Sequence, residues 1–379
     1  MTRDSFVSGD VASTMKIAFL IQDFSRGAGS ERVTSLIANG LVRRGHEVCI
    51  ISISGDNTSF YPLDESVTLR TLVPGGGLDN KRYFLKAYAH LGRLLRQMRP
   101  DVVVNVFAAL GIYTIPNARR IGYRTVSWEH FNYKVQVGMN PLGRKFAARH
   151  ADQIVTLTET DKGYYLEDNP SMRAGICSIF NPSPYQVSES QRLDKKPVVL
   201  SVGRLTEQKG FDRLLRAWAH VERDERSAGW ELRIVGEGEE REALAAELEE
   251  LALERAYLAG ARKDVDAVYR QARIYASTAR FEGLPMTMIE AQSFGLPIVS
   301  LDYDTGPRDI ITNGVDGILV EQDAGEDDAI ARFAEALLRC MSSPESTAAM
   351  GQVALESSRR FESERLVDQW EGLLSRLVG

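Results

Sequence analysis

The chain has 379 residues, of which 44% are hydrophobic and 26% charged, and its net charge is −6 at pH 7. This composition is typical of a soluble globular protein, and the length favours two domains over one. No apolar run approaches the roughly 20 residues that span a bilayer. The cysteines, Cys49, Cys177 and Cys340, lack both metal-ligand spacing and a disulfide framework, which fits a reducing cytoplasm.

The charge is unevenly distributed. Residues 1–195 carry 24 Lys and Arg against 18 Asp and Glu, whereas the remainder carries 22 against 34. Such drift between halves is unremarkable in itself, but it also fits a first half that faces an anionic partner.

Residues 1–14 are polar, lack the apolar core of a signal peptide and are expected to form a flexible tail. Continuous apolar runs then recur along the chain: KIAFLI, EVCIISI, DVVVNVFA, RTVSWEH, QIVTLT, PVVLSVG, ELRIVGEG, AYLAG, ARIYAS and LPIVSLD. Continuous rather than alternating runs predict parallel strands buried on both faces. Helical patterns lie between them, as in SERVTSLIANGLVRRG, so the predicted class is α/β with right-handed crossovers.

We predict two Rossmann-like, doubly wound domains with boundaries set by composition. The first covers 15–185, a linker covers 186–196 and the second domain covers 197–358. Residues 359–379 have apolar positions at helical spacing and are expected to form a helix that packs on the first domain. The expected ligand site is the cleft between the domains, at the carboxyl ends of the strands.

The first predicted strand leads into QDFSRGAGSERV, where Gly27 and Gly29 precede a helix. Glycines there let backbone N–H groups approach a phosphate, although any turn from strand to helix favours glycine. The stretch departs from GxGxxG, and no acidic residue closes the second strand. Both departures count against a dinucleotide cofactor.

The second half opens with SVGRLTEQKG, in which Arg204 and Lys209 directly follow a buried strand. A single cation on a loop is usually just solvated. Two cations at the carboxyl end of a strand, beside a helix entry, suit a diphosphate: Arg offers a planar fork and Lys a point charge.

The stretch FEGLPMTMIEAQSFGLPIVS places Glu282 before a helix and Glu290 inside it. Pro285 suits the first helical turn, so Gly283 and Leu284 would stand at the helix entry with free N–H groups facing an anion. Glu290 could accept hydrogen bonds from vicinal hydroxyls, as acidic residues do from ribose. A diphosphate, hydroxyl groups and two carboxylates together indicate a nucleotide sugar.

These motifs, with IVGEGEEREAL, AGARKDV and TGPRDIITNGVDGILV, occur in the order found in retaining glycosyltransferases of family 4, which this chain resembles. The Glu-x7-Glu pattern from Glu282 to Glu290 is that family's hallmark. The likeness is dense in the second half and thinner in the first, where it rests on AGSER and SWEH. It implies the GT-B fold, with a donor-binding C-terminal domain, and assembly of bacterial cell-surface glycans.

The resemblance also implies residue roles. Arg204 and Lys209 would hold the donor diphosphate, with Gly29 behind it; Glu290 would bind ribose, and Glu282 would contact the donor sugar. The remaining implied site residues are His130 near the sugar and acceptor, Arg262 and Val265 around the base, and Gly283, Leu284, Pro285 and Met286 around the phosphates. The family's paired glycines read Ala28-Gly29 here, which is a departure.

The implied reaction needs no metal cofactor, since no Asp-x-Asp motif serves the donor half; Asp302-Tyr303-Asp304 belongs to another family element. The family suggests front-face attack, with the leaving phosphate taking the acceptor proton, while double displacement through Glu282 stays open. The donor is expected to be a UDP-hexose or UDP-N-acetylhexosamine.

Other functions remain open from the residues alone. A glycoside hydrolase would also use two carboxylates but needs no Arg204–Lys209 clamp. A GT-B sugar-nucleotide epimerase would share the nucleotide site, and a non-catalytic scaffold would bind nucleotide sugar or membrane without turnover. Nucleic acid is not indicated as a partner.

The acceptor is expected to be a glycan or a lipid-linked glycan. Residues 83–101 combine apolar positions with Lys86, Arg93, Arg96 and Arg99, and GRKFAARH adds Arg144, Lys145 and Arg149. Such faces are often merely solvated, but basic amphipathic surfaces also lie on anionic lipid. We therefore expect a cytoplasmic protein at the inner face of the cell membrane.

Overall fold

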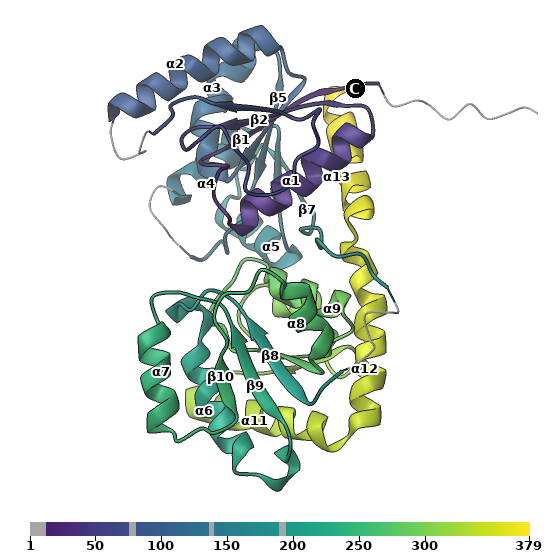
Figure 1. Cartoon of the computed structure of the whole chain (residues 1–379). Coiled ribbons are helices and arrows are strands. Elements are labelled where there is room, and N and C mark those ends of the chain that lie inside the picture. The colour runs from purple at the N-terminus through teal and green to yellow at the C-terminus, as the bar shows by residue number, and fades with distance from the viewer. Residues whose placement is uncertain (1–12, 76–80, 136–139, 189–194) are drawn as a thin grey trace, which may run out of the picture.

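The computed structural model describes residues 13–75, 81–135, 140–188 and 195–379. Most of the expected N-terminal tail and residues 189–194 of the expected linker lie outside these ranges. Over the described residues the strands form two separate sheets, and every pairing in both is parallel. Figure 1 shows the two sheets, each with its helices, as two bodies one above the other.

The first domain contains a seven-stranded sheet in the order β3-β2-β1-β4-β5-β6-β7. Its strands are β1 Lys16–Ile21, β2 Glu47–Ser52, β3 Thr68–Thr71, β4 Val102–Val106, β5 Arg124–Trp128, β6 Gln153–Thr156 and β7 Gly175–Ser178. Its helices are α1 Gly29–Arg43, α2 Lys81–Met98, α3 Gly111–Ile121, α4 Asn140–His150 and α5 Glu159–Asp168, with a 3₁₀ turn η1 at Ala108–Leu110.

The second domain contains a six-stranded sheet in the order β10-β9-β8-β11-β12-β13. Its strands are β8 Val198–Val202, β9 Glu231–Val235, β10 Ala256–Leu258, β11 Ile274–Ser277, β12 Ile298–Leu301 and β13 Gly317–Val320. Its helices are α6 Phe211–Glu222, α7 Arg241–Glu250, α8 Val265–Gln271, α9 Met286–Ser293, α10 Pro307–Ile310, α11 Glu326–Ser342 and α12 Pro344–Ser357, with 3₁₀ turns η3 Glu207–Lys209 and η4 Glu225–Ser227.

The predicted α/β class with two Rossmann-like sheets is confirmed, and each of the ten apolar runs contains a strand. Three strands were not predicted: β3, β7 and β13. All three are four-residue strands at sheet edges, and β3 and β7 are at least partly exposed along their whole length. An edge strand is buried less completely than a central one, and β3 (TLRT) and β7 (GICS) accordingly lack a continuous apolar run. β13 (GILV) is apolar but only four residues long.

The chain crosses between the domains twice, and the two crossings are hydrogen-bonded to each other. The first crossing leaves β7 and passes Ser183; the second runs from α12 through η5 Ser358–Phe361 into α13 Ser363–Val378. The Ser183 N–H donates to the carbonyl of Phe361 at 2.7 Å, and the Ser363 hydroxyl donates to the carbonyl of Ser183 at 3.0 Å. We call these two hydrogen-bonded crossings, around Ser183 and around Phe361–Ser363, the hinge between the domains.

The C-terminal helix α13 lies on the first domain, against α1 (Figure 1). Gly40 allows the close approach, because a Cβ there would lie 2.4 Å from a methyl carbon of Val367. The fully buried Trp370 ring lies 4.7 Å from that of Trp128, centroid to centroid. At the rim Arg44 pairs with Glu371, and Nε2 of His46 lies 3.0 Å from the same carboxylate. Residues from the far end of the chain therefore complete the first domain's core.

Replacing Trp370 with alanine is expected to destabilise the first domain by about 3–5 kcal/mol, the usual cost of truncating a large buried aromatic side chain. Val378, on the same helix, is 40% exposed, so Val378→Ala should change stability by less than about 0.5 kcal/mol. Urea unfolding followed by tryptophan fluorescence measures both. Equal midpoints for Trp370→Ala and the wild type would contradict the anchoring role of α13.

Candidate functional site

Loops at the carboxyl ends of strands in both domains meet in one region, joined by side-chain bonds across the domain boundary. Arg32 of the first domain pairs with Glu290 of the second at 2.8 Å. The Asn132 side-chain amide donates to the Thr305 hydroxyl at 2.8 Å, and Lys134 pairs with Asp304 at 3.3 Å. The expected cleft site therefore draws residues from both domains.

The entry of α9 presents free backbone donors. Pro285 is the N-cap of this helix rather than part of its first turn, and no side chain caps the helix. The N–H groups of Met288 and Ile289 both donate to the Pro285 carbonyl. Those of Met286 and Thr287 donate to no residue that the structure describes, so they can meet an anion.

Glu282 and Lys209 form an ion pair beside this helix entry. Their side chains are 13% and 21% exposed. The Gln208 side chain donates to the Phe281 carbonyl at 3.0 Å and lies 3.4 Å from the Glu282 carboxylate. The structure therefore brings together two of the residues singled out in the sequence, one cationic and one anionic.

Arg204 lies just after β8 and is exposed. Its guanidinium makes no hydrogen bond or ion pair with any residue within the described ranges. An exposed guanidinium without a carboxylate partner keeps its full charge and all its donors for a ligand.

Glu290 lies in the first turns of α9 with a side chain only 6% exposed, and both its oxygens have partners. Arg32 donates to Oε1 at 2.8 Å, and the Tyr269 hydroxyl donates to Oε2 at 2.9 Å. Burial raises the pKa of Glu290 above its usual range, and the nearby charges of Arg32 and Lys209, with the Tyr269 bond, oppose that shift.

Gly29 is the first residue of α1, and a Cβ there would touch nothing within 4 Å. The space around it is open to a ligand, but it does not require glycine. The carboxylate of Glu31 is buried in the same helical turn, where desolvation raises its pKa. A negative charge at this helix start would oppose a phosphate, so α9 is the better anion site.

The His130 side chain is packed against aromatic rings rather than exposed to solvent. Its ring centroid lies 4.3 Å from that of Trp128 and 5.4 Å from that of Phe107, and its Nε2 is buried without a described hydrogen-bond partner. Burial lowers the pKa of His130 to about 3, so the ring is neutral at physiological pH. Its carbonyl lies against Gly283, where a Cβ would come within 2.7 Å of it. The predicted role near the sugar and acceptor stays a prediction.

A buried ion pair holds the segment that follows His130. Arg144 donates to Glu129 at 2.9 Å, and both side chains are at most 3% exposed. The same guanidinium donates to the carbonyls of Tyr133 and Asn132. The expectation that Arg144 contributes to a basic membrane-facing surface is therefore wrong: the helical pattern of GRKFAARH turns this position inward, where Glu129 neutralises it.

Asn132 connects this segment to Glu282. Its amide approaches the Glu282 carbonyl at 3.3 Å, and the Thr305 hydroxyl donates to the same carbonyl at 2.5 Å. Thr305 is thus hydrogen-bonded to both Asn132 and Glu282. The backbone that carries Glu282 is thereby tied to the first domain.

Arg262 and Val265 stand at the entry of α8. The Arg262 guanidinium forms two hydrogen bonds to Asp264, at 3.0 and 2.9 Å, and is 49% exposed. Val265 begins the helix that carries Tyr269 one turn later. Tyr269 of this helix donates to Glu290, and the predicted contacts of Arg262 and Val265 with the base stay a prediction.

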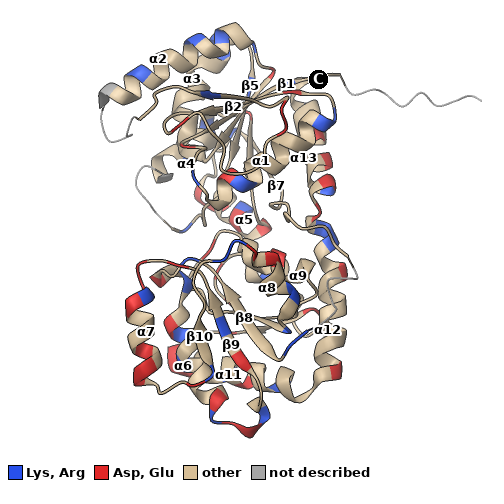
Figure 2. Cartoon of the chain, in the orientation of Figure 1, with Lys and Arg blue, Asp and Glu red and all other residues tan. Residues whose placement is uncertain are grey.

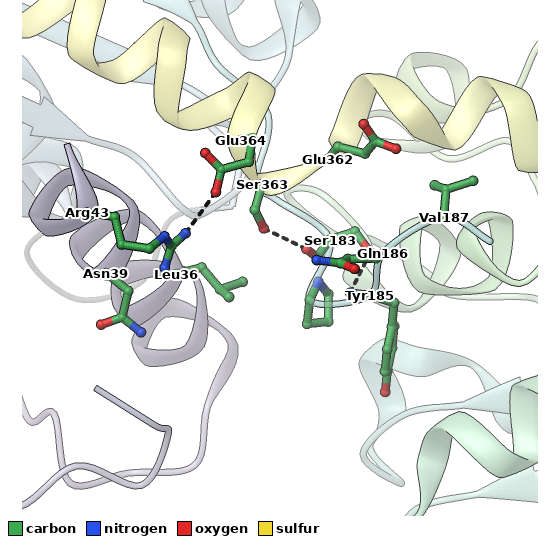
Figure 3. A pocket seen from close by; sticks show the side chains of 11 residues that line it. Leu36, Asn39, Arg43, Ser183, Tyr185, Gln186, Val187, Glu362, Ser363 and Glu364 are labelled. Carbon is green, nitrogen blue, oxygen red and sulfur yellow. Dashed lines mark hydrogen bonds and ion pairs between the residues drawn. The ribbon is translucent and has the colours of Figure 1, made fainter. Parts of the chain in front are cut away.

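Two hollows lie away from these residues. One of about 410 Å³ adjoins the hinge and is lined by α1, by residues 183–187 and by the start of α13, as Figure 3 shows. The other, about 600 Å³, lies by Asp101, Arg124 and Asp152, next to the amino ends of the first domain's strands. Neither hollow is lined by Arg32, Lys209, Glu282 or Glu290.

Among the described residues, no group of three or more His, Cys, Asp or Glu side chains could hold a metal ion. Asp302 pairs with Arg308, and Asp304 bonds to Lys134 and Tyr164. Within the same ranges, no helix is both long enough and apolar enough to cross a membrane.

Arg32, Tyr269, Asn132 and Thr305 were not predicted as site residues. Arg32 belongs to AGSERV, and its spacing of three from Gly29 places both on one helical face, which was an available signal. Tyr269, Asn132 and Thr305 offered none, because only the tertiary structure brings them to Glu290 and Glu282.

Comparison with known proteins identifies the chain. Residues 186–356 match the family model "Glycosyl transferases group 1", and residues 27–181 match "Glycosyltransferase Family 4". An uncharacterized glycosyltransferase of Haemophilus influenzae is 30% identical over 95% of this chain and 99% of its own length. The amylovoran biosynthesis glycosyltransferase AmsD of Erwinia amylovora is also 30% identical, with the same coverage. A Campylobacter jejuni transferase named for adding N-acetylgalactosamine to an undecaprenol-linked glycan is 27% identical over 96% of this chain.

Solved structures agree on the fold. Anabaena HepE, crystallised with UDP and glucose, superposes with a TM-score of 0.76 over 96% of this chain and all of its own, at 18% identity. Sucrose-phosphate synthase of Thermosynechococcus elongatus gives 0.78 over 95% and 98% of the two chains, also at 18% identity. With both halves matched by family models and full-length relatives at 30% identity, the chain belongs to the family 4-like glycosyltransferases of the GT-B fold.

Proposed function

We propose that this glycosyltransferase moves a hexosyl or N-acetylhexosaminyl group from a UDP-sugar to a hydroxyl of a lipid-linked glycan. The transfer would retain the anomeric configuration and need no metal ion. The observation that carries this proposal is the set of charges at the carboxyl ends of the second domain's strands: the Lys209–Glu282 pair and the buried Glu290 at α9, with Arg204, which has no ion-pair partner among the described residues, just after β8.

The relatives support the substrate classes. HepE was crystallised with UDP and glucose, the Campylobacter relative is named for transfer to an undecaprenol-linked glycan, and AmsD is named for polysaccharide biosynthesis. The HepE title supports a uridine donor and the Campylobacter name supports a lipid-linked glycan acceptor, and the cations near α9 suit the diphosphate of such a donor.

In the proposed reaction the bond from the anomeric carbon to the diphosphate oxygen breaks, and a bond from that carbon to the acceptor oxygen forms. The acceptor proton passes to an oxygen of the leaving diphosphate. Arg204, Lys209 and the free N–H groups at the start of α9 would stabilise the negative charge that develops on the leaving group. This cationic set replaces what a divalent ion would otherwise supply.

Glu282 would contact the donor sugar near the reacting carbon. Its hydrogen-bonding environment is fixed on one side by Lys209, and its backbone is fixed by Thr305 and Asn132. A carboxylate held in this way can orient sugar hydroxyls and stabilise positive charge at the anomeric carbon.

We also propose that α2 lies on anionic lipid at the cytoplasmic face of the membrane, where a lipid-linked acceptor would be presented. Figure 2 shows Lys and Arg along this helix and no acidic residue. Leu85 is 66% exposed, and Lys86, Arg93 and Arg96 are exposed. Exposed leucine beside exposed cations suits the interface of an anionic bilayer.

Arg204→Gln and Lys209→Met are each expected to weaken UDP binding by about tenfold or more, since a hydrogen bond to a charged group contributes about 1.5–3 kcal/mol. Isothermal titration calorimetry with EDTA present measures this and tests metal independence together. Arg339, on α11, is 71% exposed and provides the control Arg339→Gln, which should leave UDP binding unchanged. Wild-type binding that appears only after Mg²⁺ is added would refute metal independence.

Glu282→Gln is expected to lower kcat by about a hundredfold or more, because it removes a charge that acts at the reacting centre. UDP affinity should hold or improve, since Lys209 loses its ion-pair partner. Release of UDP from UDP-glucose, UDP-galactose and their N-acetylated counterparts, with lipid-linked glycan as acceptor, measures turnover, and the product's anomeric configuration tests retention. Nucleotide binding without any turnover would favour a scaffold instead.

Replacing Lys86, Arg93 and Arg96 with glutamine is expected to reduce binding to phosphatidylglycerol vesicles, by about 1 kcal/mol for each cation removed. Co-sedimentation at low salt measures the bound fraction. Binding of the wild type should fall as salt is added, because screening weakens the attraction. If the wild type does not co-sediment with these vesicles at low salt, the membrane proposal is refuted.

A further inference from the structure

We infer that Arg32 is a positioning residue of the donor site, which reaches across the cleft to orient Glu290 and so makes ribose recognition depend on closure of the two domains. The inference rests on the proposed function, since it takes Glu290 as the group that accepts the ribose hydroxyls. It concerns a residue of the opposite domain, whose position only the tertiary structure reveals.

The Arg32–Glu290 contact is a hydrogen-bonded ion pair that is largely shielded from solvent. Nη1 of Arg32, in the first turn of α1, donates to Oε1 of Glu290 at 2.8 Å. The Arg32 side chain is 30% exposed and that of Glu290 6% exposed. In an environment with so little water, the attraction is screened far less than at the surface.

The Arg32 guanidinium is also held by two aromatic rings. Its central carbon lies 5.9 Å from the ring centroid of Tyr61 and 5.7 Å from that of Tyr185. Tyr61 belongs to the connection from β2 to β3, and Tyr185 follows the first crossing between the domains. One guanidinium thus meets the first domain, the hinge and the second domain, and the rings limit the entropy lost in holding so long a side chain.

Glu290 keeps acceptor sites for a diol while these bonds are in place. A carboxylate offers about four acceptor sites, two on each oxygen. Arg32 uses one site on Oε1, and the Tyr269 hydroxyl uses one on Oε2. One site on each oxygen remains, which matches the two hydroxyls of a ribose. Arg32 from one side and Tyr269 from the other fix the plane of the carboxylate before the nucleotide arrives.

Arg32 is also the cation on which the charge of Glu290 depends most. The other cation that lowers its pKa is Lys209, and that ammonium already pairs with Glu282. When the cleft opens, Arg32 leaves with the first domain, and the buried carboxylate loses its closest positive charge. Ribose should then bind more weakly to the open form, and by linkage the nucleotide should favour the closed form.

The helix that carries Arg32 also borders the hinge about which the domains would rotate. Leu36, Asn39 and Arg43 line the hollow beside the hinge (Figure 3), and they follow Arg32 at helical spacing on α1. One face of a single rigid helix therefore reaches from the hinge to Glu290. A small rotation between the domains is transmitted directly to the Arg32–Glu290 contact.

The test compares UDP with 2′,3′-dideoxyuridine diphosphate on Arg32→Gln, Arg32→Lys, Glu290→Gln and the wild type, by calorimetry. Arg32→Gln is expected to weaken UDP binding about tenfold and the dideoxy analogue far less, because only UDP carries the hydroxyls that Glu290 accepts. Arg32→Lys should recover part of the loss. Arg32→Gln in the Glu290→Gln background should cost little more, since both changes remove one interaction.

The matched control is Lys16→Gln, which removes an exposed cation of the same domain, paired with Glu47 at 3.5 Å at the opposite end of β1. It should bind both ligands as the wild type does. Circular dichroism and melting temperature report whether each variant folds.

The pH dependence supplies an independent readout. Among the described residues, six titratable or charged groups face Glu290: Arg32, Tyr269, Lys209, Tyr61, Tyr185 and Tyr275. Only the ionised carboxylate accepts both hydroxyls, so UDP affinity is lost as pH falls through the raised pKa of Glu290. Removing Arg32 removes a cation that opposes this rise, so the loss in Arg32→Gln should begin at a higher pH than in the wild type.

Several results would overturn the inference. Equal weakening of UDP and its dideoxy analogue would show that Arg32 contacts phosphate or merely supports the fold. If Glu290→Gln weakens UDP binding and Arg32→Gln does not, the positioning role fails while the proposed function stands. If the wild type binds no UDP, the proposed donor fails and the inference with it.

Closure of the two domains is tested by small-angle X-ray scattering. The radius of gyration without nucleotide should be larger for Arg32→Gln than for the wild type, and equal radii would refute the link between Arg32 and closure.

Discussion

The candidate site depends on one constraint: two parallel sheets must turn the carboxyl ends of their strands toward the same cleft. Parallel strands place all their carboxyl ends on one edge, so each sheet offers one row of loops. Arg204 and Lys209 follow β8, Glu282 follows β11 and His130 follows β5. Residues far apart in sequence meet because the hinge sets the two edges face to face.

The hinge and α13 hold the edges in that relation. The two chain crossings bond to each other through Ser183, and α13 buries Trp370 in the first domain. The second domain is therefore attached at both ends of its sequence, which permits rotation while limiting separation. The bonds across the cleft, from Arg32 to Glu290 and from Asn132 to Thr305, then close the opposite side.

Charge in the cleft is arranged in pairs that a donor can use. Lys209 is balanced by Glu282 and Arg32 by Glu290, while Arg204 has no carboxylate partner among the described residues. Buried charges are costly unless paired, so each pair offsets part of the cost of burying its two members. The diphosphate of the proposed donor would add negative charge, which the Arg204 guanidinium and the free N–H groups at the α9 entry would each favour.

The sequence by itself determined the class of fold, because central strands buried on both faces must be continuous apolar runs. It also determined the residues that belong to local motifs, such as Glu282 with Glu290 and Arg204 with Lys209, since those lie next to strand ends along the chain. Only the tertiary structure decided which groups face them. Arg32 and Tyr269 reach the Glu290 carboxylate from separate elements, and Asn132 reaches the backbone carbonyl of Glu282. Arg144, a basic residue in a basic stretch, turns inward to Glu129. The physical reason is that periodicity records whether a position is buried, whereas its partner depends on how whole elements pack.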